Sequence, residues 1–278
     1  MHLFIIYIKG ILIGISDLVP GISGGTMAMI TNIYPKLISS LNEINFTLWQ
    51  EYQQYGLKKV LTKIHFSFLI FLFSGILTSI ILFSHFILFL YQNYPIQIKS
   101  FFIGLIVISA YYLYQELTKK NIYSYLLLSI GFIIGICITV ISPFQFTFSY
   151  FNVFLSGCIA ICAMLLPGIS GSFILLILGS YHTIIMAVTT VNIPVLSAFF
   201  IGCLVGLLSF SKILHYLLSH FYEYMLNFLI GLMLGSLYAI YPFKQNDLNF
   251  ILLQQNINSA IIYTLLGGIT LFLLKKMK

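Results

Sequence analysis

Two short stretches rich in proline, glycine and hydroxyl side chains hold the residue types best suited to binding chemistry. The first reads VPGISGGT from Val19, and the second reads LPGISGSF from Leu166. Proline removes a backbone donor and disfavours helix in the residue before it, while glycine permits tight turns and close approach to a ligand. A helix that restarts after such a break presents unpaired N–H groups, which bind anions. The pattern predicts a site for phosphate or carboxylate, unless the small residues serve only helix packing.

Both stretches supply residues to this predicted site. The first contributes Pro20, Gly21, Ser23, Gly24, Gly25 and Thr26. The second contributes Pro167, Gly168, Ser170, Gly171 and Ser172. We expect helices to begin near Gly24 and near Gly171, where the hydroxyls add donors beside the free N–H groups.

Three charged side chains are further candidates for substrate binding. Asp17 lies in an apolar run, where a carboxylate is costly and marks a functional site by default. The sequence leaves three roles open for its carboxylate: it binds a coupling proton or cation, it pairs with a lysine, or it caps a helix. Lys9 either neutralises phosphate charge or extends its ammonium to the membrane interface. Lys212, at the end of an apolar run, either contacts phosphate or anchors its helix.

The composition places the chain in the class of all-α polytopic membrane proteins. Of its 278 residues, 60% are hydrophobic and only 7% are charged, with a mean hydropathy of +1.05. An aqueous core could not bury so much apolar surface. The net charge of +7 comes from lysine alone, since the chain contains no arginine. We interpret this excess as a topology signal and not as a surface for nucleic acid.

Catalytic and metal-binding signatures are missing from the sequence. The four cysteines lie in apolar runs, and no histidine or second thiol pair completes a metal site. The nucleotide-binding loop, the zinc-protease helix and the nucleophile elbow are also missing. We therefore expect neither an enzyme nor a cofactor or metal. Any energy for transport must come from an ion gradient, the membrane potential or the substrate gradient.

The apolar runs define the elements that must position the site. The arms of the two broken elements are expected at 3–18 with 24–41, and at 151–166 with 172–188. Full spans are expected near 65–91, 95–115, 122–142, 194–210, 224–242 and 256–274. Segment 42–63 is polar and amphipathic, which suits a helix in the membrane interface. Segment 211–222 reads as a short amphipathic connection.

The chain contains an internal repeat. Pro20 and Pro167 are 147 residues apart, and Gly10 and Gly157 keep this spacing. Later in each half the spacing falls to 127, as the pattern around Phe101 recurs around Phe228. An insertion at 42–63 explains the difference. We predict one membrane domain, 1–278, with repeat 1 at 1–142 and repeat 2 at 151–278.

The two repeats are expected to be inverted relative to each other. A broken element returns the chain to the side of the membrane from which it came, so each half makes only three net crossings. Because three is an odd number, the second half starts on the opposite side of the membrane from the first. If 42–63 is cytoplasmic, most lysines fall inside, and only Lys99 and Lys244 fall near the outer face. The positive-inside rule then places both termini in the cytoplasm.

The break regions resemble a known family. The run from Gly14 to Thr26, the run from Met164 to Phe173 and the run from Gly231 to Leu237 are similar to signatures of the bacterial polyprenyl-phosphate transporter family of PopT type. The resemblance extends over essentially the whole chain. It implies a plasma-membrane translocase that returns undecaprenyl phosphate, the lipid carrier of cell-wall synthesis, to the cytoplasmic leaflet. Because arginine is absent, any cationic contact to the phosphate must come from lysine or histidine.

The residues and the resemblance lead to one functional hypothesis and two alternatives. We expect a lipid translocase in which inverted broken helices hold the phosphate near the midplane and the prenyl tail stays among the membrane lipids. A transporter of a small soluble anion could use the same breaks. A membrane-embedded enzyme acting on lipid phosphate would need an activated nucleophile or metal ligands, and the sequence shows neither.

Overall fold

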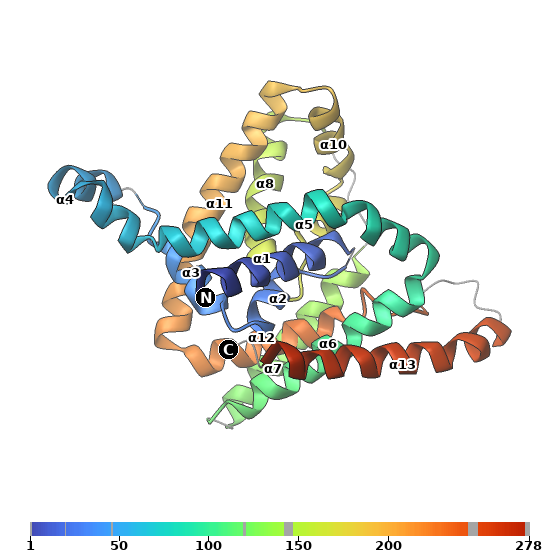
Figure 1. Ribbon diagram of the computed structural model, residues 1–278. Helices are drawn as coiled ribbons and strands as arrows, with labels where there is room; N and C mark the ends of the chain where they lie inside the picture. The colour runs from blue at the N-terminus through green and yellow to red at the C-terminus, as the bar shows by residue number, and fades with distance from the viewer. Residues whose placement is uncertain are drawn as a thin grey trace.

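Every regular element in the described part of the chain is a helix (Figure 1). The computed structural model describes residues 2–19, 21–45, 47–118, 121–141, 147–243 and 250–275. Helices satisfy their backbone hydrogen bonds within each segment, as a lipid environment requires. The protein is an all-α polytopic membrane protein.

The same order of helices occurs in both halves, apart from one additional helix. The first half contains α1 (His2–Leu18), α2 (Gly24–Ile30), α3 (Tyr34–Asn42), α4 (Thr47–Lys63), α5 (Phe66–Asn93), α6 (Pro95–Gln115) and α7 (Ile122–Val140). The second contains α8 (Tyr150–Leu165), α9 (Gly171–Ile177), α10 (Tyr181–Thr189), α11 (Ile193–His220), α12 (Tyr222–Ser236) and α13 (Phe250–Lys275). Helices α2 and α9 have 7 residues each, α3 and α10 have 9, and α5 and α11 have 28. The additional helix, α4, falls within the segment expected to be an insertion.

Both Pro-Gly stretches interrupt a helix where the sequence predicted. Helix α2 begins at Gly24 and helix α9 at Gly171. Within the breaks, Gly21 and Gly168 adopt left-handed conformations with φ of 86° and 89°. Side chains with a Cβ adopt this region only at a cost, so glycine sets the direction in which each chain leaves the break.

The prediction of one continuous second arm in each broken element was wrong. Residues 31–33 separate α2 from α3, and residues 178–180 separate α9 from α10. The chain turns at Asn32 and Gly179, whose φ angles are 59° and 69°. Helices α9 and α10 are bent by 112° relative to each other. Asparagine and glycine tolerate the left-handed conformation, and this is the local signal that could have predicted the second turn.

Four helices in the described residues are long and apolar enough to cross a membrane: α5, α6, α7 and α11. The bent pair α9–α10 adds a fifth if it counts as one span. Helix α11 continues to His220, so the prediction of a separate amphipathic segment at 211–222 was wrong. Helix α12 ends at Ser236, before the predicted end of its span.

Glycines bring two equivalent pairs of helices into close contact. A Cβ on Gly10 of α1 would lie 3.2 Å from the Cα of Gly75 in α5. A Cβ on Gly157 of α8 would lie 3.2 Å from the backbone nitrogen of Cys203 in α11. In lipid, the hydrophobic effect does not drive helices together, so their association depends on close packing. Small residues such as glycine allow the two backbones to approach this closely. The α1–α5 pair and the α8–α11 pair therefore form two similarly built arms, which cross in Figure 1.

Helix α12 lies inside the bundle. It packs against α7, α6 and α11, and its residues Leu229, Leu232 and Met233 are fully buried. A helix that is buried along most of its surface needs no polar face, which matches its largely apolar sequence.

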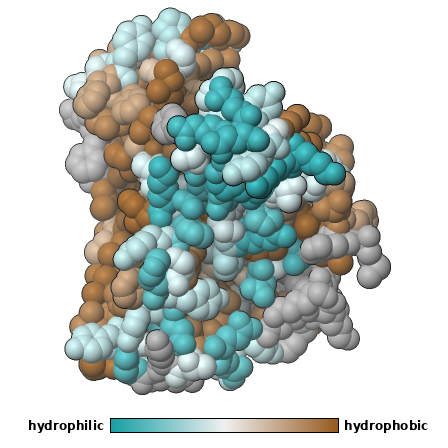
Figure 2. Space-filling model, turned by 90° about the vertical axis from the view of Figure 1, so that its left-hand side faces the viewer, coloured by the Kyte–Doolittle hydropathy of each residue, from teal (hydrophilic) through white to brown (hydrophobic). Residues whose placement is uncertain are grey.

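Helix α4 projects from the rest of the molecule (Figure 1). None of its residues is buried, and it bends at Gly56, whose φ is 76°. Figure 2 views the side on which α4 lies, and it shows hydrophilic side chains gathered on this face with hydrophobic ones along the flank. This distribution fits a face that looks out of the membrane, with α4 in its interface.

Candidate functional site

The two Pro-Gly breaks meet in the interior of the protein. The N–H of Gly168 donates a 2.7 Å hydrogen bond to Oγ1 of Thr26, although the two residues are 142 positions apart. The hydroxyl of Ser23 lies 3.4 Å from the carbonyl oxygen of Leu166, to which it donates. Thr26 and Ser23 are 2% and 1% exposed. Buried polar groups require hydrogen-bond partners, and each break supplies such partners to polar groups of the other break.

Tyr34 adds a third link between the halves, which the sequence did not predict. Its hydroxyl donates a 2.9 Å hydrogen bond to the carbonyl oxygen of Leu165, the last residue of α8. Tyr34 is 1% exposed. A buried tyrosine usually pairs its hydroxyl, and here the acceptor is a free carbonyl at a helix end.

The first break has its own anion. Oδ1 of Asp17 accepts a 2.6 Å hydrogen bond from the N–H of Gly24. The hydroxyl of Ser23 accepts from the N–H of Gly25 at 3.1 Å, and the carbonyl of Ser23 accepts from Thr26 at 3.0 Å. A carboxylate at this place offsets the positive end of α2. The first-turn donors of α2 are therefore already paired, and Asp17 acts as a cap.

The second break has the same backbone but no acid. Met164 stands where the first break has its aspartate. The hydroxyls of Ser170 and Ser172 lie 2.9 Å apart, and Ser170 makes no capping bond. Across the described parts of the chain, no acceptor meets the N–H groups of Gly171, Ser172 and Phe173. Three open donors and two hydroxyls thus gather at one place, which suits a ligand with several acceptor oxygens.

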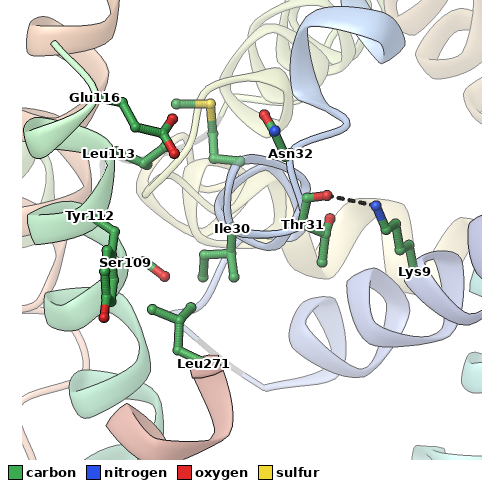
Figure 3. Close-up of a pocket in the computed structure, with 10 residues that line it drawn as sticks. Lys9, Ile30, Thr31, Asn32, Ser109, Tyr112, Leu113, Glu116 and Leu271 are labelled. Atoms are coloured by element: carbon green, nitrogen blue, oxygen red, sulfur yellow. Dashed lines mark hydrogen bonds between the residues drawn. The ribbon is translucent and has the colours of Figure 1, made fainter. Parts of the chain in front are cut away.

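Lys9 lies at the opposite end of α2 from the break. Its Nζ donates a 2.9 Å hydrogen bond to the carbonyl oxygen of Thr31, the C-cap of the helix (Figure 3). Seven helical residues, about 10 Å, separate this end from the first-turn donors. A cation is favourable at a helix C-terminus for the same reason that an anion is favourable at the N-terminus. Lys9 and Asp17, both on α1, therefore hold α2 by its two ends.

A small pocket with both polar and apolar walls lies at the Lys9 end of α2. Glu116 and Ser109 of α6 face it from the other side (Figure 3), and Asn32 lies at its rim. Ser109 is 2% exposed, and its hydroxyl has no partner among the described residues. The cavity volume is only about 30 Å³, roughly the space of one water molecule. The place of the Glu116 carboxylate beside this pocket is evident only in the folded chain.

Among the remaining candidates, Pro167 and Gly21 belong to the breaks, and Lys212 lies on the surface of the protein. Lys212 is exposed on α11, and its ammonium has no hydrogen bond or ion pair in the part of the chain that the structure describes. Pro167 is buried in the second break, and Gly21 packs near Ile240. Pro20 lies outside the described residues. No cluster of three histidine, cysteine or acidic side chains able to hold a metal occurs within the described ranges.

Comparisons with known proteins assign the chain to a family. A profile described as undecaprenyl phosphate translocase-like matches residues 13–256. The chain is 46% identical over 239 residues to a polyprenyl-phosphate transporter of Vibrio cholerae serotype O1, which covers 86% of this chain and 78% of the relative. It is 32% identical over 284 residues to a polyprenyl-phosphate transporter of Staphylococcus aureus, which covers 95% of both chains. No solved structure matches.

These relatives are named as transporters and not as enzymes, in agreement with the prediction from the sequence. The family match spans both breaks and most of the helices that surround them. The chain belongs to the undecaprenyl phosphate translocase-like family.

Proposed function

We propose that this protein translocates a polyprenyl phosphate, with undecaprenyl phosphate as the expected lipid, across the bacterial plasma membrane. Membership of the family and the names of the two relatives support the substrate. The meeting of the breaks supports the mechanism, because it places hydroxyl and backbone donors from both halves in the interior of an apolar bundle. The protein must screen one phosphate during its crossing, since an unscreened charge in hydrocarbon is very costly.

The observation that carries this proposal is the difference between the two breaks. In the first, the carboxylate of Asp17 accepts from the N–H of Gly24. In the second, the N–H groups of Gly171 and Ser172 meet no acceptor among the described residues. In our proposal, the substrate phosphate takes the role at the second break that the Asp17 carboxylate has at the first. We place the substrate phosphate at the second break, against Ser170 and Ser172, with oxygens accepting from the open N–H groups.

The other candidate residues act around this site in our proposal. Thr26 and Ser23 join the first break to the second and so transmit movement between the repeats. Lys9 and Asp17 fix the position of α2, and a coupling proton or cation would bind at Asp17. We place Lys212 at the cytoplasmic surface, where it attracts the phosphate before entry.

The proposed mechanism is alternating access between two inverted repeats. The α1–α5 and α8–α11 pairs rock relative to each other about the contact between the breaks, so that the second break opens to one leaflet and then to the other. The positive-inside rule favours a cytoplasmic N-terminus and C-terminus.

Reconstituted protein tests this proposal. Liposomes that contain undecaprenyl phosphate are treated from outside with a phosphatase that cannot cross the membrane. Without translocation, only lipid in the outer leaflet releases phosphate. We expect the purified protein to expose the inner-leaflet lipid too, with or without an imposed proton or sodium gradient. Uptake of inorganic phosphate without exposure of the lipid would support the soluble-anion alternative and refute ours.

A further inference from the structure

Two apolar grooves lie in the two halves of the protein. The first is formed mainly by α5 and α6, beside α1 and α13, and has a cavity volume of about 370 Å³. Seven of its lining residues come from the end of α5 and the beginning of α6: Ile87, Leu90, Tyr94, Gln97, Ile98, Phe101 and Phe102. All but Tyr94 and Gln97 have purely hydrocarbon side chains, so the walls suit an apolar ligand.

The second groove is formed mainly by α11 and α12, beside α7, and has a cavity volume of about 730 Å³. Of the seven residues that follow those of the first groove by 127 positions, six line it: Leu214, Leu217, Phe221, Tyr224, Met225 and Phe228. The seventh, Leu229, is fully buried. This spacing is the one that relates the later helices of the two repeats. Equivalent positions of the two repeats therefore form a groove in each half of the protein.

Each groove lies at the turn that joins its two long helices. The turn residue has φ −132° and ψ 49° at Tyr94, and φ −129° and ψ 38° at Phe221. The same local backbone thus shapes both grooves. In the proposed inverted arrangement, these turns lie at opposite membrane surfaces, so that one groove serves each leaflet.

The second groove borders the second break. Leu166, the residue before Pro167, forms part of its wall. Four residues further along the chain, Ser170 begins the group of open donors and hydroxyls. A ligand with a long apolar chain in the groove could extend its polar end past Leu166 toward these donors. This shared wall residue distinguishes the groove from the general lipid-facing surface of the bundle.

We propose that the two grooves bind the isoprenoid chain of the lipid, one in each leaflet, while its phosphate passes between the breaks. The proposal rests on the proposed function above and adds where the chain lies. It requires that the protein recognise chain and phosphate at separate places, so that filling a groove weakens the binding of long-chain lipid and leaves the phosphate contacts intact.

Matched tryptophan substitutions test the grooves. Leu90→Trp fills the first and Leu217→Trp fills the second, and both leucines are partly buried. The controls Ile81→Trp and Ile213→Trp lie on the same helices at positions that are 73% and 53% exposed. Binding of undecaprenyl phosphate and of geranyl phosphate, which carries the same phosphate on a short chain, is measured with full-length protein in phospholipid nanodiscs.

We expect each groove variant to bind undecaprenyl phosphate about tenfold more weakly. Binding of geranyl phosphate should change by less than about twofold, and the two controls should behave as wild type. Unchanged binding of the long lipid by both groove variants would overturn the proposal. If wild type binds neither phosphate lipid, the proposed function itself fails.

A second measurement uses wild-type protein only, so it tests the grooves even if the tryptophan variants fold poorly. Wild-type protein is irradiated with undecaprenyl phosphate that carries a photoreactive group in its chain, and the labelled peptides are identified by mass spectrometry. We expect labels near Tyr94 and Phe221 that unlabelled undecaprenyl phosphate displaces and phosphatidylglycerol does not. Equal displacement by phosphatidylglycerol would show that ordinary acyl chains occupy the grooves and would refute the assignment.

Discussion

Oδ1 of Asp17 accepts a 2.6 Å hydrogen bond from the N–H of Gly24, so the first Pro-Gly break is closed by an anion that the chain itself supplies. The matching place in the second break belongs to Met164, whose Cβ lies 3.4 Å from the position that a Cβ on Gly171 would take. Two breaks with the same backbone therefore differ in charge, and this difference is the reason that we propose the second break as the site of the substrate phosphate.

Substitution Met164→Asp should close the second break as Asp17 closes the first. The new carboxylate would accept from the open N–H of Gly171 and repel the phosphate. We expect translocation of undecaprenyl phosphate to fall at least about tenfold at neutral pH. The measurement is the phosphatase accessibility assay in liposomes. Met164→Asn, which has the same shape without the charge, is the control and should keep most activity. Equal loss in both variants would indicate a steric effect and contradict the charge argument.

Substitution Thr26→Val should weaken the contact between the halves. It keeps the shape of the side chain but removes the acceptor for the N–H of Gly168, which is left unpaired in a buried place. We expect a loss of about 1–3 kcal/mol in stability, seen as a lower melting temperature in detergent.

The control for this prediction is Thr31→Val. The hydroxyl of Thr31 donates to the carbonyl of Met27 in its own helix, and this carbonyl also accepts from the N–H of Thr31. Its removal should therefore cost less than about 1 kcal/mol. Similar melting temperatures for the two variants would show that the contact between the breaks contributes little.

Helix α4 should detach at high pH. Lys63, at its end, forms ion pairs with Glu51 of α4 and with Glu43, the C-cap of α3. The hydrogen bond to Glu51, followed by the nearby Glu43, raises the pKa of Lys63 above its ordinary value. Because the pKa is raised in the folded protein, the link is complete at neutral pH and is lost as the pH rises through that raised value.

A spin label on Gln53→Cys, in a background without the native cysteines, measures this detachment. We expect low mobility at neutral pH and higher mobility above the ordinary lysine pKa of about 10.4. Lys63→Gln should be mobile at neutral pH already. The control Lys59→Gln, whose ammonium lies over the ring of Tyr55 within α4, should resemble wild type. A Lys63→Gln protein with a wild-type spectrum would show that the ion pairs do not hold α4.

The orientation of the chain can be measured directly. Single cysteines at Gln53 and Thr147, both exposed, lie on opposite sides of the membrane in the proposed topology. In intact cells, an impermeant thiol reagent should label Thr147→Cys and should label Gln53→Cys only after the membrane is opened. The reverse pattern would invert the topology and, with it, the leaflet assigned to each groove.

Local features of the protein followed from the sequence because they depend on a few neighbouring residues. The helix starts at Gly24 and Gly171 follow from the conformations that Pro167, Gly21 and Gly168 impose or allow. The predicted long helices α5, α6 and α7 follow from uninterrupted apolar runs. The second turns at Asn32 and Gly179 were missed, although their residue types permit the left-handed conformation, because such residues occupy many other conformations too.

Only the tertiary structure decided how the charged and hydroxyl groups are used. Lys9 and Asp17 break the symmetry of the repeat in the sequence, but their binding to opposite ends of α2 depends on how α1 packs beside it. The bond between Thr26 and Gly168 joins residues 142 positions apart, and no local pattern encodes such a pair. Short-range backbone preferences thus determined where the helices break, while long-range packing of apolar surfaces determined which donors and acceptors of the two breaks are paired.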